Sequence, residues 1–255
     1  MSRTFTLKGH GSFLEADLYP PVELNPNYDY CLGLIGLFTY NSIPNVETGV
    51  NDKLYYYYSS SSSNSKEKED VDLKKLIIPT GSYEISDLER YIQEHINGST
   101  KTSRDQIFSL KPNNNTLKAE LQSIYNIDFG KEGTLGNLLG FSKKVLVANT
   151  KHESDMPVNI IKVTSIRVEC NIVTGSFYAG LPCHTLYEFS PTVDPGYAIN
   201  IEPMHPLYLP LINKNVIDKI TIKLIDQNSD PVNFRGEEVV VRLELKTING
   251  SYISQ

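Results

Sequence analysis

Alternating apolar and polar positions are clearest in the last third of the chain. Apolar residues occupy every second position at 166–172, 220–224 and 239–245, with polar or charged residues between them. A two-residue period of this kind is typical of strands that bury one face. Shorter or Pro-interrupted stretches predict three further strands, at 184–189, 197–201 and 207–211. Strands at this spacing with no helix between them predict a β-sandwich.

The N-terminal half is more mixed. Strands are predicted at Thr4–Lys8 and Phe13–Leu18, before the Pro20-Pro21 break. The stretch Cys31–Phe38 is apolar at nearly every position, which predicts a central strand covered on both faces. Residues 55–58 favour a strand, whereas residues 59–72 are a Ser-rich and charged run that predicts a projecting, mobile loop.

One helix is well signalled in the middle of the chain. Ser86 and Glu89 have the spacing of a capping box, and Asn97-Gly98 is a stop signal. The residues between them carry a helical apolar stripe, formed by Leu88, Tyr91, Ile92, His95 and Ile96.

A strand at 117–122 and a short helix at Leu135–Leu139, capped by Thr134, follow this helix. These elements predict a small α/β insertion at about residues 76–145. The one shift in composition that resembles a boundary is the polar run 149–156, so the predicted halves are residues 1–148, including the insertion, and 149–255.

Composition narrows the class of protein. The chain has 255 residues, of which 40% are hydrophobic, enough for a core without metal or disulfide support. Its 24 Lys and Arg against 30 Asp and Glu give a net charge of −6, the wrong sign for a dedicated nucleic-acid surface. No apolar run is long enough to span a membrane, and no signal-peptide pattern is present, so we expect a protein that is not secreted and stays in the cytosol or nucleus.

The sequence offers little catalytic chemistry. Cys31, Cys170 and Cys183 form no CxxC pair, and we interpret them as reduced thiols. Cys183 and His184 are adjacent, but neighbours on a strand point to opposite faces and therefore cannot exchange a proton. The sequence predicts no metal site either, because His152, Glu153 and Asp155 lack the spacing of metal ligands and fit a solvated loop. We therefore predict no catalytic, cofactor-binding or metal-binding residues and no enzyme activity.

The sequence leaves three alternatives open, one about catalytic acids and two about binding surfaces. A glycosidase recruits two carboxylates from distant positions, which the sequence cannot pair. The 16 Tyr residues suit either strands or binding interfaces. Similarly, the segment 175–182, with Phe177 and Tyr178, is either an interface loop or an ordinary strand connection.

Four short motifs occur in one order along the chain. They are Tyr40-Asn41-Ser42-Ile43-Pro44-Asn45, Ile78-Pro79-Thr80-Gly81-Ser82-Tyr83-Glu84-Ile85, Gly136-Asn137-Leu138-Leu139-Gly140-Phe141 and Val232-Asn233-Phe234-Arg235-Gly236-Glu237-Glu238. Together they resemble the jelly-roll capsid proteins of Polinton-like elements (Maverick, adintovirus) and their domesticated relatives in animal genomes. The resemblance spans most of residues 5–246.

This resemblance implies a mainly β fold of jelly-roll sandwiches, with a double jelly roll favoured. It implies a structural virion protein without catalysis, which assembles as a homotrimer with other capsid subunits into an icosahedral shell. The expected location is the virion, assembled in the host cytoplasm or nucleus. One alternative is a single jelly roll with an inserted subdomain, as in penton-type proteins, which form pentamers. Another is a β-sandwich module that binds a glycan or a protein.

Overall fold

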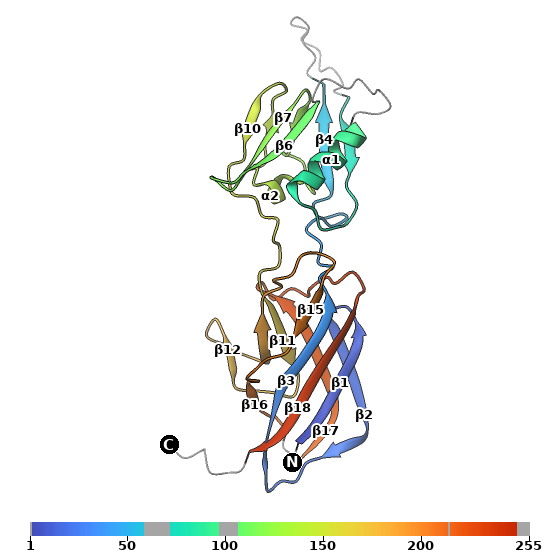
Figure 1. Ribbon diagram of the computed structural model, residues 1–255, viewed down its shortest axis with the longest axis vertical. Helices are drawn as coiled ribbons and strands as arrows, with labels where there is room; N and C mark the ends of the chain where they lie inside the picture. The colour runs from blue at the N-terminus through green and yellow to red at the C-terminus, as the bar shows by residue number, and fades with distance from the viewer. Residues whose placement is uncertain (1, 59–71, 97–106, 214, 249–255) are drawn as a thin grey trace, which may run out of the picture. The chain divides into compact units, whose positions relative to one another are not determined.

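The computed structural model describes residues 2–58, 72–96, 107–213 and 215–248, mostly as antiparallel β-sheets (Figure 1). The prediction of a mainly β protein is confirmed. Contacts group the chain into two compact units: unit 1 comprises Met1–Ile43 and Val163–Gln255, and unit 2 comprises Pro44–Lys162. Among the described residues, no helix is both long and apolar enough to span a membrane.

Unit 1 contains a first sheet, sheet A, built around β3. Its strands, in spatial order, are β1 (Ser2–His10), β18 (Glu238–Ile248), β3 (Asp29–Tyr40) and β15 (Ala198–Ile201), and β16 (Tyr208–Pro210) also pairs with β3. β15 meets the C-terminal end of β3 and β16 meets its N-terminal end. The two short strands therefore occupy the place of one interrupted strand.

Sheet B is the second sheet of unit 1. Its spatial order is β14 (Thr185–Phe189), β11 (Ile166–Cys170), β17 (Val216–Asp226) and β2 (Phe13–Glu23). All its pairings are antiparallel. The strands predicted from alternation in the C-terminal third are thus present and are divided between the two sheets.

The connectivity of these strands defines a jelly roll. With β15 and β16 taken as one strand, sheet A has the chain order 1-8-3-6 and sheet B has 5-4-7-2. Eight antiparallel strands that alternate in this way between two sheets form the double Greek key of a jelly roll. Unit 1 is therefore a complete single jelly roll, and unit 2 is inserted in the sequence between its third and fourth strands.

The two sheets of unit 1 enclose one apolar core. Leu34 and Leu243 from sheet A and Val168 and Ile222 from sheet B are at most 1% exposed. Val168, Ile222 and Leu243 occupy alternate positions of their strands, as the two-residue period predicts. The strand β3 differs from expectation on its outer face, because Phe38 and Tyr40 are exposed, so only part of it is covered on both sides.

A two-stranded hairpin leaves sheet B between β11 and β14. It consists of β12 (Ser176–Tyr178) and β13 (Leu181–Cys183). Its two-residue turn, Ala179-Gly180, has positive φ at both positions (48° and 82°), the conformation that matches the twist of a tight hairpin.

Unit 2 has its own core and two smaller sheets. One has the order β5 (Lys74–Ile77), β4 (Lys53–Tyr57), β8 (Asn126–Asp128) and β9 (Val145–Leu146). The other has the order β10 (Lys151–Glu153), β7 (Lys118–Ser123) and β6 (Phe108–Asn113). Helix α1 (Ile85–Ile96) buries Leu88, Ile92 and Ile96 in this core, and α2 (Gly136–Leu139) is a single turn.

Both helices are found where they were predicted, but their predicted caps are wrong. Helix α1 begins at Ile85, one residue before Ser86, and the Glu89 carboxylate accepts a hydrogen bond from the Leu110 backbone N–H at 3.0 Å instead. Helix α2 has Leu135 at its N-cap and no side-chain cap, so Thr134 does not cap it. At the start of α1, the Asp87 carboxylate accepts a hydrogen bond from the Glu84 backbone N–H at 3.3 Å, so Asp87 takes the role predicted for Glu89.

The observed units also differ from the predicted division at residues 148 and 149. The polar run 149–156 contains β10, which pairs with β7 inside unit 2. The insertion accordingly spans residues 44–162 rather than about 76–145. The predicted mobile loop at 59–72 and the helix stop at Asn97-Gly98 lie outside the described residues, apart from residue 72.

Candidate assembly surface

The residues that the sequence raised as possible chemistry are held apart. The Cys183 thiol lies 3.3 Å from both Ser176 Oγ and Thr185 Oγ1, whereas His184 Nδ1 lies 2.7 Å from the Val173 carbonyl. Burial raises the pKa of the Cys183 thiol, but the hydrogen bonds with Ser176 and Thr185 outweigh it and lower the pKa overall. The adjacent thiol and imidazole therefore do not form a pair.

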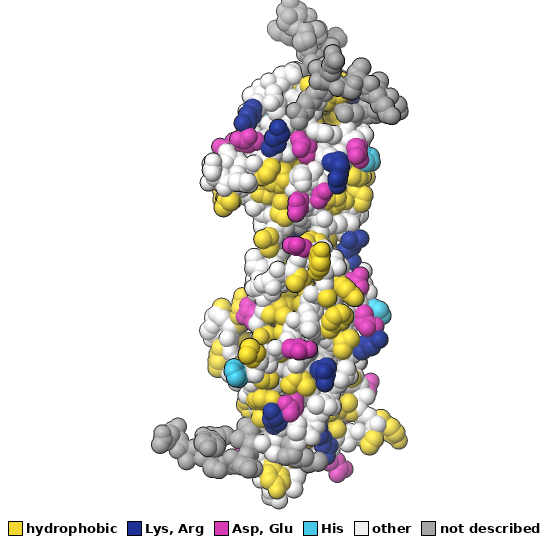
Figure 2. All heavy atoms as spheres, viewed as in Figure 1, with side chains coloured by type: hydrophobic (Ala, Val, Ile, Leu, Met, Phe, Trp, Pro, Cys, Tyr) yellow, Lys and Arg dark blue, Asp and Glu magenta, His cyan; other side chains and the backbone are white. Residues whose placement is uncertain are grey.

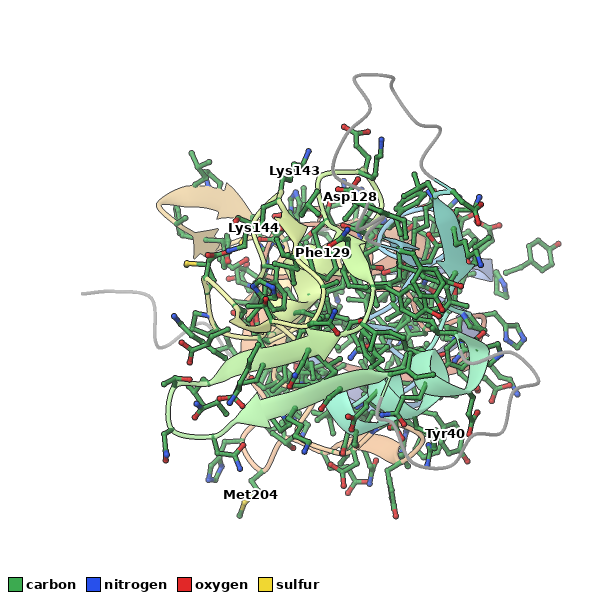
Figure 3. The ribbon with its side chains drawn as sticks, turned by 90° about the horizontal axis from the view of Figure 1, so that it is seen from above. Tyr40, Asp128, Phe129, Lys143, Lys144 and Met204 are labelled. Carbon is green, nitrogen blue, oxygen red and sulfur yellow. The ribbon has the colours of Figure 1, made fainter. Side chains whose placement is uncertain are left out.

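The acidic and histidine residues near 152 are also separated by their partners. His152 Nε2 lies 2.9 Å from the Val147 carbonyl, and Glu153 accepts a hydrogen bond from Thr116 at 3.0 Å. Asp155 accepts hydrogen bonds from Ser142 and Lys144, which hold the pKa of this carboxyl far below its usual range. Figure 3 labels Lys143 and Lys144 beside Asp128 and Phe129 in the same unit. Across the described ranges, no three His, Cys, Asp or Glu side chains are grouped to hold a metal ion.

The surfaces of unit 1 are more informative than its interior, which side chains fill. A depression lined by Arg3, Glu23, Leu24, Tyr30 and Leu245 has an interior volume of about 10 Å³. That volume holds about one water molecule. This depression is therefore too small for an organic ligand.

One end of the outer face of sheet A is aromatic. The rings of Phe38 and Tyr40 pack edge to face with centroids 5.5 Å apart, and both are exposed. Their neighbours across the ladder are Asn200 and Ala198 of β15. Figure 2 shows hydrophobic side chains gathered over β3, β18 and their neighbours on this face.

The interrupted edge of sheet A adds to this apolar area. Met204, in the connection between β15 and β16, is 91% exposed, and Tyr197 and Leu207 flank the two strands and are also exposed. Figure 3 shows Tyr40 and Met204 on the same side of the molecule. Large apolar side chains grouped in this way mark a protein-binding surface more often than scattered ones do.

At the other end of the same face, polar side chains are hydrogen-bonded together around a tyrosine that packs over Gly33. The Tyr208 ring lies across Gly33, where a Cβ would come within 2.8 Å of the ring carbons. The Tyr208 hydroxyl donates to Glu244 at 2.6 Å and accepts a hydrogen bond from Lys246 Nζ at 2.6 Å. Ser2 Oγ donates to the same carboxylate at 2.7 Å. The hydrogen bond from Tyr208, then those from Ser2 and Lys246, lower the pKa of Glu244 from 4.5 to about 2.

The β12–β13 hairpin is held against sheet B through Tyr178, whose hydroxyl donates a hydrogen bond to the Gln227 carbonyl at 3.0 Å. The Arg167 guanidinium carbon lies 3.7 Å from the Tyr178 ring centroid, and Arg167 also donates to Ser229 Oγ at 2.7 Å. The Arg167 side chain is only 2% exposed. The hairpin thus covers a buried cation with one face and presents Phe177 and Leu181, which are 70% and 71% exposed, to solvent.

The four motifs that carry the sequence resemblance form structural contacts in the two units. Asn45 is hydrogen-bonded through its side chain to the backbone N–H and carbonyl of Tyr83, so the first two motifs meet in unit 2. In the third motif, Phe141 stacks on Phe129 with centroids 5.2 Å apart. In the fourth, Phe234 is buried in the jelly-roll core. Each motif therefore stabilises a turn or a core contact.

The chain resembles a known protein in its fold and not in its sequence. No protein-family model and no curated protein matches the sequence. Among solved structures, the chain is similar to the mavirus penton protein, known from a crystal structure of its selenomethionine-labelled form. The two share 11% sequence identity over 97% of this chain and 99% of that chain, with a TM-score of 0.49.

Proposed function

We propose that this chain is a structural subunit of a viral shell, which acts by self-association and not by catalysis. The observation that carries the proposal is the complete jelly roll of unit 1, whose interior is filled by side chains and whose outer surface presents grouped aromatic and aliphatic residues. Jelly rolls serve in capsids, lectins and cupins. A filled interior favours the capsid role over those that bind a small ligand between the sheets.

The ordered motifs support the same role. The residues that resemble Polinton-like capsid proteins, such as Asn45 and Phe234, fix turns and the core, which is what a shared scaffold requires. We infer that the protein resides in the virion, with other capsid subunits as partners. Assembly would take place in the host cytoplasm or nucleus.

One jelly roll per chain favours a vertex subunit over a facet subunit. A double-jelly-roll chain supplies two sandwiches, so three copies surround a pseudo-sixfold position. A chain with one jelly roll supplies a single sandwich, and five copies close a ring at a fivefold vertex. We therefore propose the penton-type alternative, a cyclic pentamer, over the trimer.

A ring needs two different surfaces on each copy, because contacts in cyclic oligomers above the dimer are head to tail. The edge formed by Phe38, Tyr40, Tyr197, Met204 and Leu207 is the first surface that we propose. The exposed tip of the β12–β13 hairpin is the second. Burial of such side chains between copies is the expected driving force.

Light scattering during size exclusion, followed by electron microscopy of the same peak, tests this proposal. We expect five copies per particle, and we expect Phe38→Ser and Phe177→Ser each to weaken association by about tenfold or more. Tyr19→Ser is the matched control, since Tyr19 is a 99% exposed aromatic residue on β2, outside both surfaces. A monomer at high concentration would contradict self-assembly, and a trimer would restore the facet role.

A further inference from the structure

The free edges of the four-stranded core sheets differ in how well they are protected. In sheet B, β2 carries Pro20 and Pro21 and a register shift against β17, and β14 has only five residues. In sheet A, the edge opposite β1 is broken into β15 and β16, with Pro203 and Pro206 between them. Proline, bulges and short length are the usual ways to stop an edge strand from pairing with another chain.

Strand β1 has none of these protections. It runs for nine residues without proline, and its register with β18 is unbroken from Ser2 to His10. Its C-terminal end is covered, because β2 follows after the turn and Leu14 lies 3.1 Å from the position of a Cβ on Gly9. Near its N-terminal end, the Arg3 side chain lines the small depression beside Glu23 and Leu24. Every second residue of an antiparallel edge strand turns its N–H and C=O away from the sheet. Ser2–Leu7 therefore offers an open ladder of backbone donors and acceptors.

Positive charges are in excess beside this edge. Strand β1 carries Arg3 and Lys8 and no carboxylate, and the exposed Arg242 lies opposite Thr6. Lys8 is paired with Glu238 at 2.8 Å, whereas Arg3 and Arg242 form no ion pair with any residue in the described part of the chain. Glu244 and Glu238 of β18 also border this edge, but they are bonded to Ser2 and Lys8, so the two arginines remain in excess. Pairing of two β1 strands would bring these like charges together, which disfavours self-pairing.

We propose that the Ser2–Leu7 edge of β1 binds an extended acidic segment of a different protein, which adds to sheet A as a further strand. Backbone hydrogen bonds to β1 supply the affinity. Acidic side chains on alternate positions face Arg242, and the apolar positions between them cover Phe5, which is only partly buried against the core. Such a contact requires neither of the two surfaces proposed for the ring.

Fluorescence anisotropy with short labelled peptides tests this binding. The probes are a capped peptide of alternating Glu and Val, a second of alternating Lys and Val, and a third like the first but N-methylated at alternate residues. We expect the Glu-Val peptide to bind at least about tenfold more tightly than the other two. Arg242→Glu should weaken its binding about fivefold or more, while the matched control Lys223→Glu, on the outer face of sheet B, should leave it unchanged.

Hydrogen exchange locates the site and separates this proposal from self-assembly. Bound Glu-Val peptide should slow amide exchange in Ser2–Leu7 and not in β2 or β14. Equal affinity for the Glu-Val and Lys-Val peptides, tight binding of the N-methylated peptide, or protection at another edge would overturn the proposal. Light scattering of the same sample reports the oligomer independently, so either proposal can fail without the other.

Discussion

Sheets A and B have similar apolar inner faces, but their outer faces are built differently. The outer face of sheet B carries ion pairs between neighbouring strands: Lys219 of β17 lies 2.6 Å from Glu15 and 3.9 Å from Asp17 on β2. Sheet A instead carries small residues along β3, a tyrosine laid over one of them, and two exposed aromatic rings. Strand alternation dictates only that one face is apolar. The opposite face is free to be a hydrated surface or a contact surface.

The largest expected effect tests the shared inner faces. Leu34→Asp in sheet A and Ile222→Asp in sheet B should each prevent folding, because an unpaired carboxylate in a fully buried position costs about 4 kcal/mol or more. Circular dichroism and thermal melting measure this. If either variant melted like the parent chain, the assignment of its strand to the core would be wrong.

The next effect concerns the outer face of sheet B. Tyr178→Ala removes the ring over the buried Arg167 guanidinium and should lower the free energy of unfolding by about 2 kcal/mol. Phe177→Ala, on the same hairpin but exposed, is the control and should leave stability unchanged. Denaturant unfolding of both variants checks this, and equal losses would show that the hairpin does not anchor through Tyr178.

A smaller effect probes the small residues of sheet A. Gly33→Ala places a methyl group 2.8 Å from the Tyr208 ring and should cost about 1–2 kcal/mol, because the ring must move away from Glu244. Gly36→Ala is the matched control on the same strand, where the nearest atoms are at 3.8 Å. We expect the two melting temperatures to separate; coincident values would mean that Tyr208 does not require the glycine.

The smallest effect is a dependence on pH. Because the folded-state pKa of Glu244 is lowered to about 2, its contribution to stability is present above the ordinary value of 4.5 and is lost as the pH falls from 4.5 to 2. Solvent screening reduces this contribution to about 1 kcal/mol. Glu244→Gln should therefore be less stable at pH 7 and equal to the parent at pH 2. Melting curves across this range decide it, and a constant difference would exclude titration of Glu244 as the cause.

The inner faces could be predicted from sequence and the outer arrangement could not. Ile222 and Leu243 lie in long alternating runs, so the two-residue period alone places them in a core. Glu89 has the spacing of a capping residue, yet it hydrogen-bonds to a strand 21 residues away. Local spacing could not reveal that competing partner.

Partners distant in sequence also explain why the predicted limits of the insertion, about 76–145, are too narrow. Lys151–Glu153 is a three-residue strand of polar side chains, too short for alternation to be visible, and only its pairing with β7 assigns it to unit 2. The sequence around Phe177 and Tyr178 fits an interface loop and a plain strand connection equally well. What distinguishes the two residues is Arg167 beneath Tyr178, a contact that no sequence pattern announces.

The position of unit 2 in the chain leaves the jelly roll intact. It enters between β3 and β11, which belong to different sheets and do not pair, so every hydrogen-bonded ladder of the jelly roll is complete without it. Because the insertion has a core of its own, its packing does not depend on the core of the jelly roll. The pairings of the jelly roll therefore place no requirement on the sequence of residues 44–162.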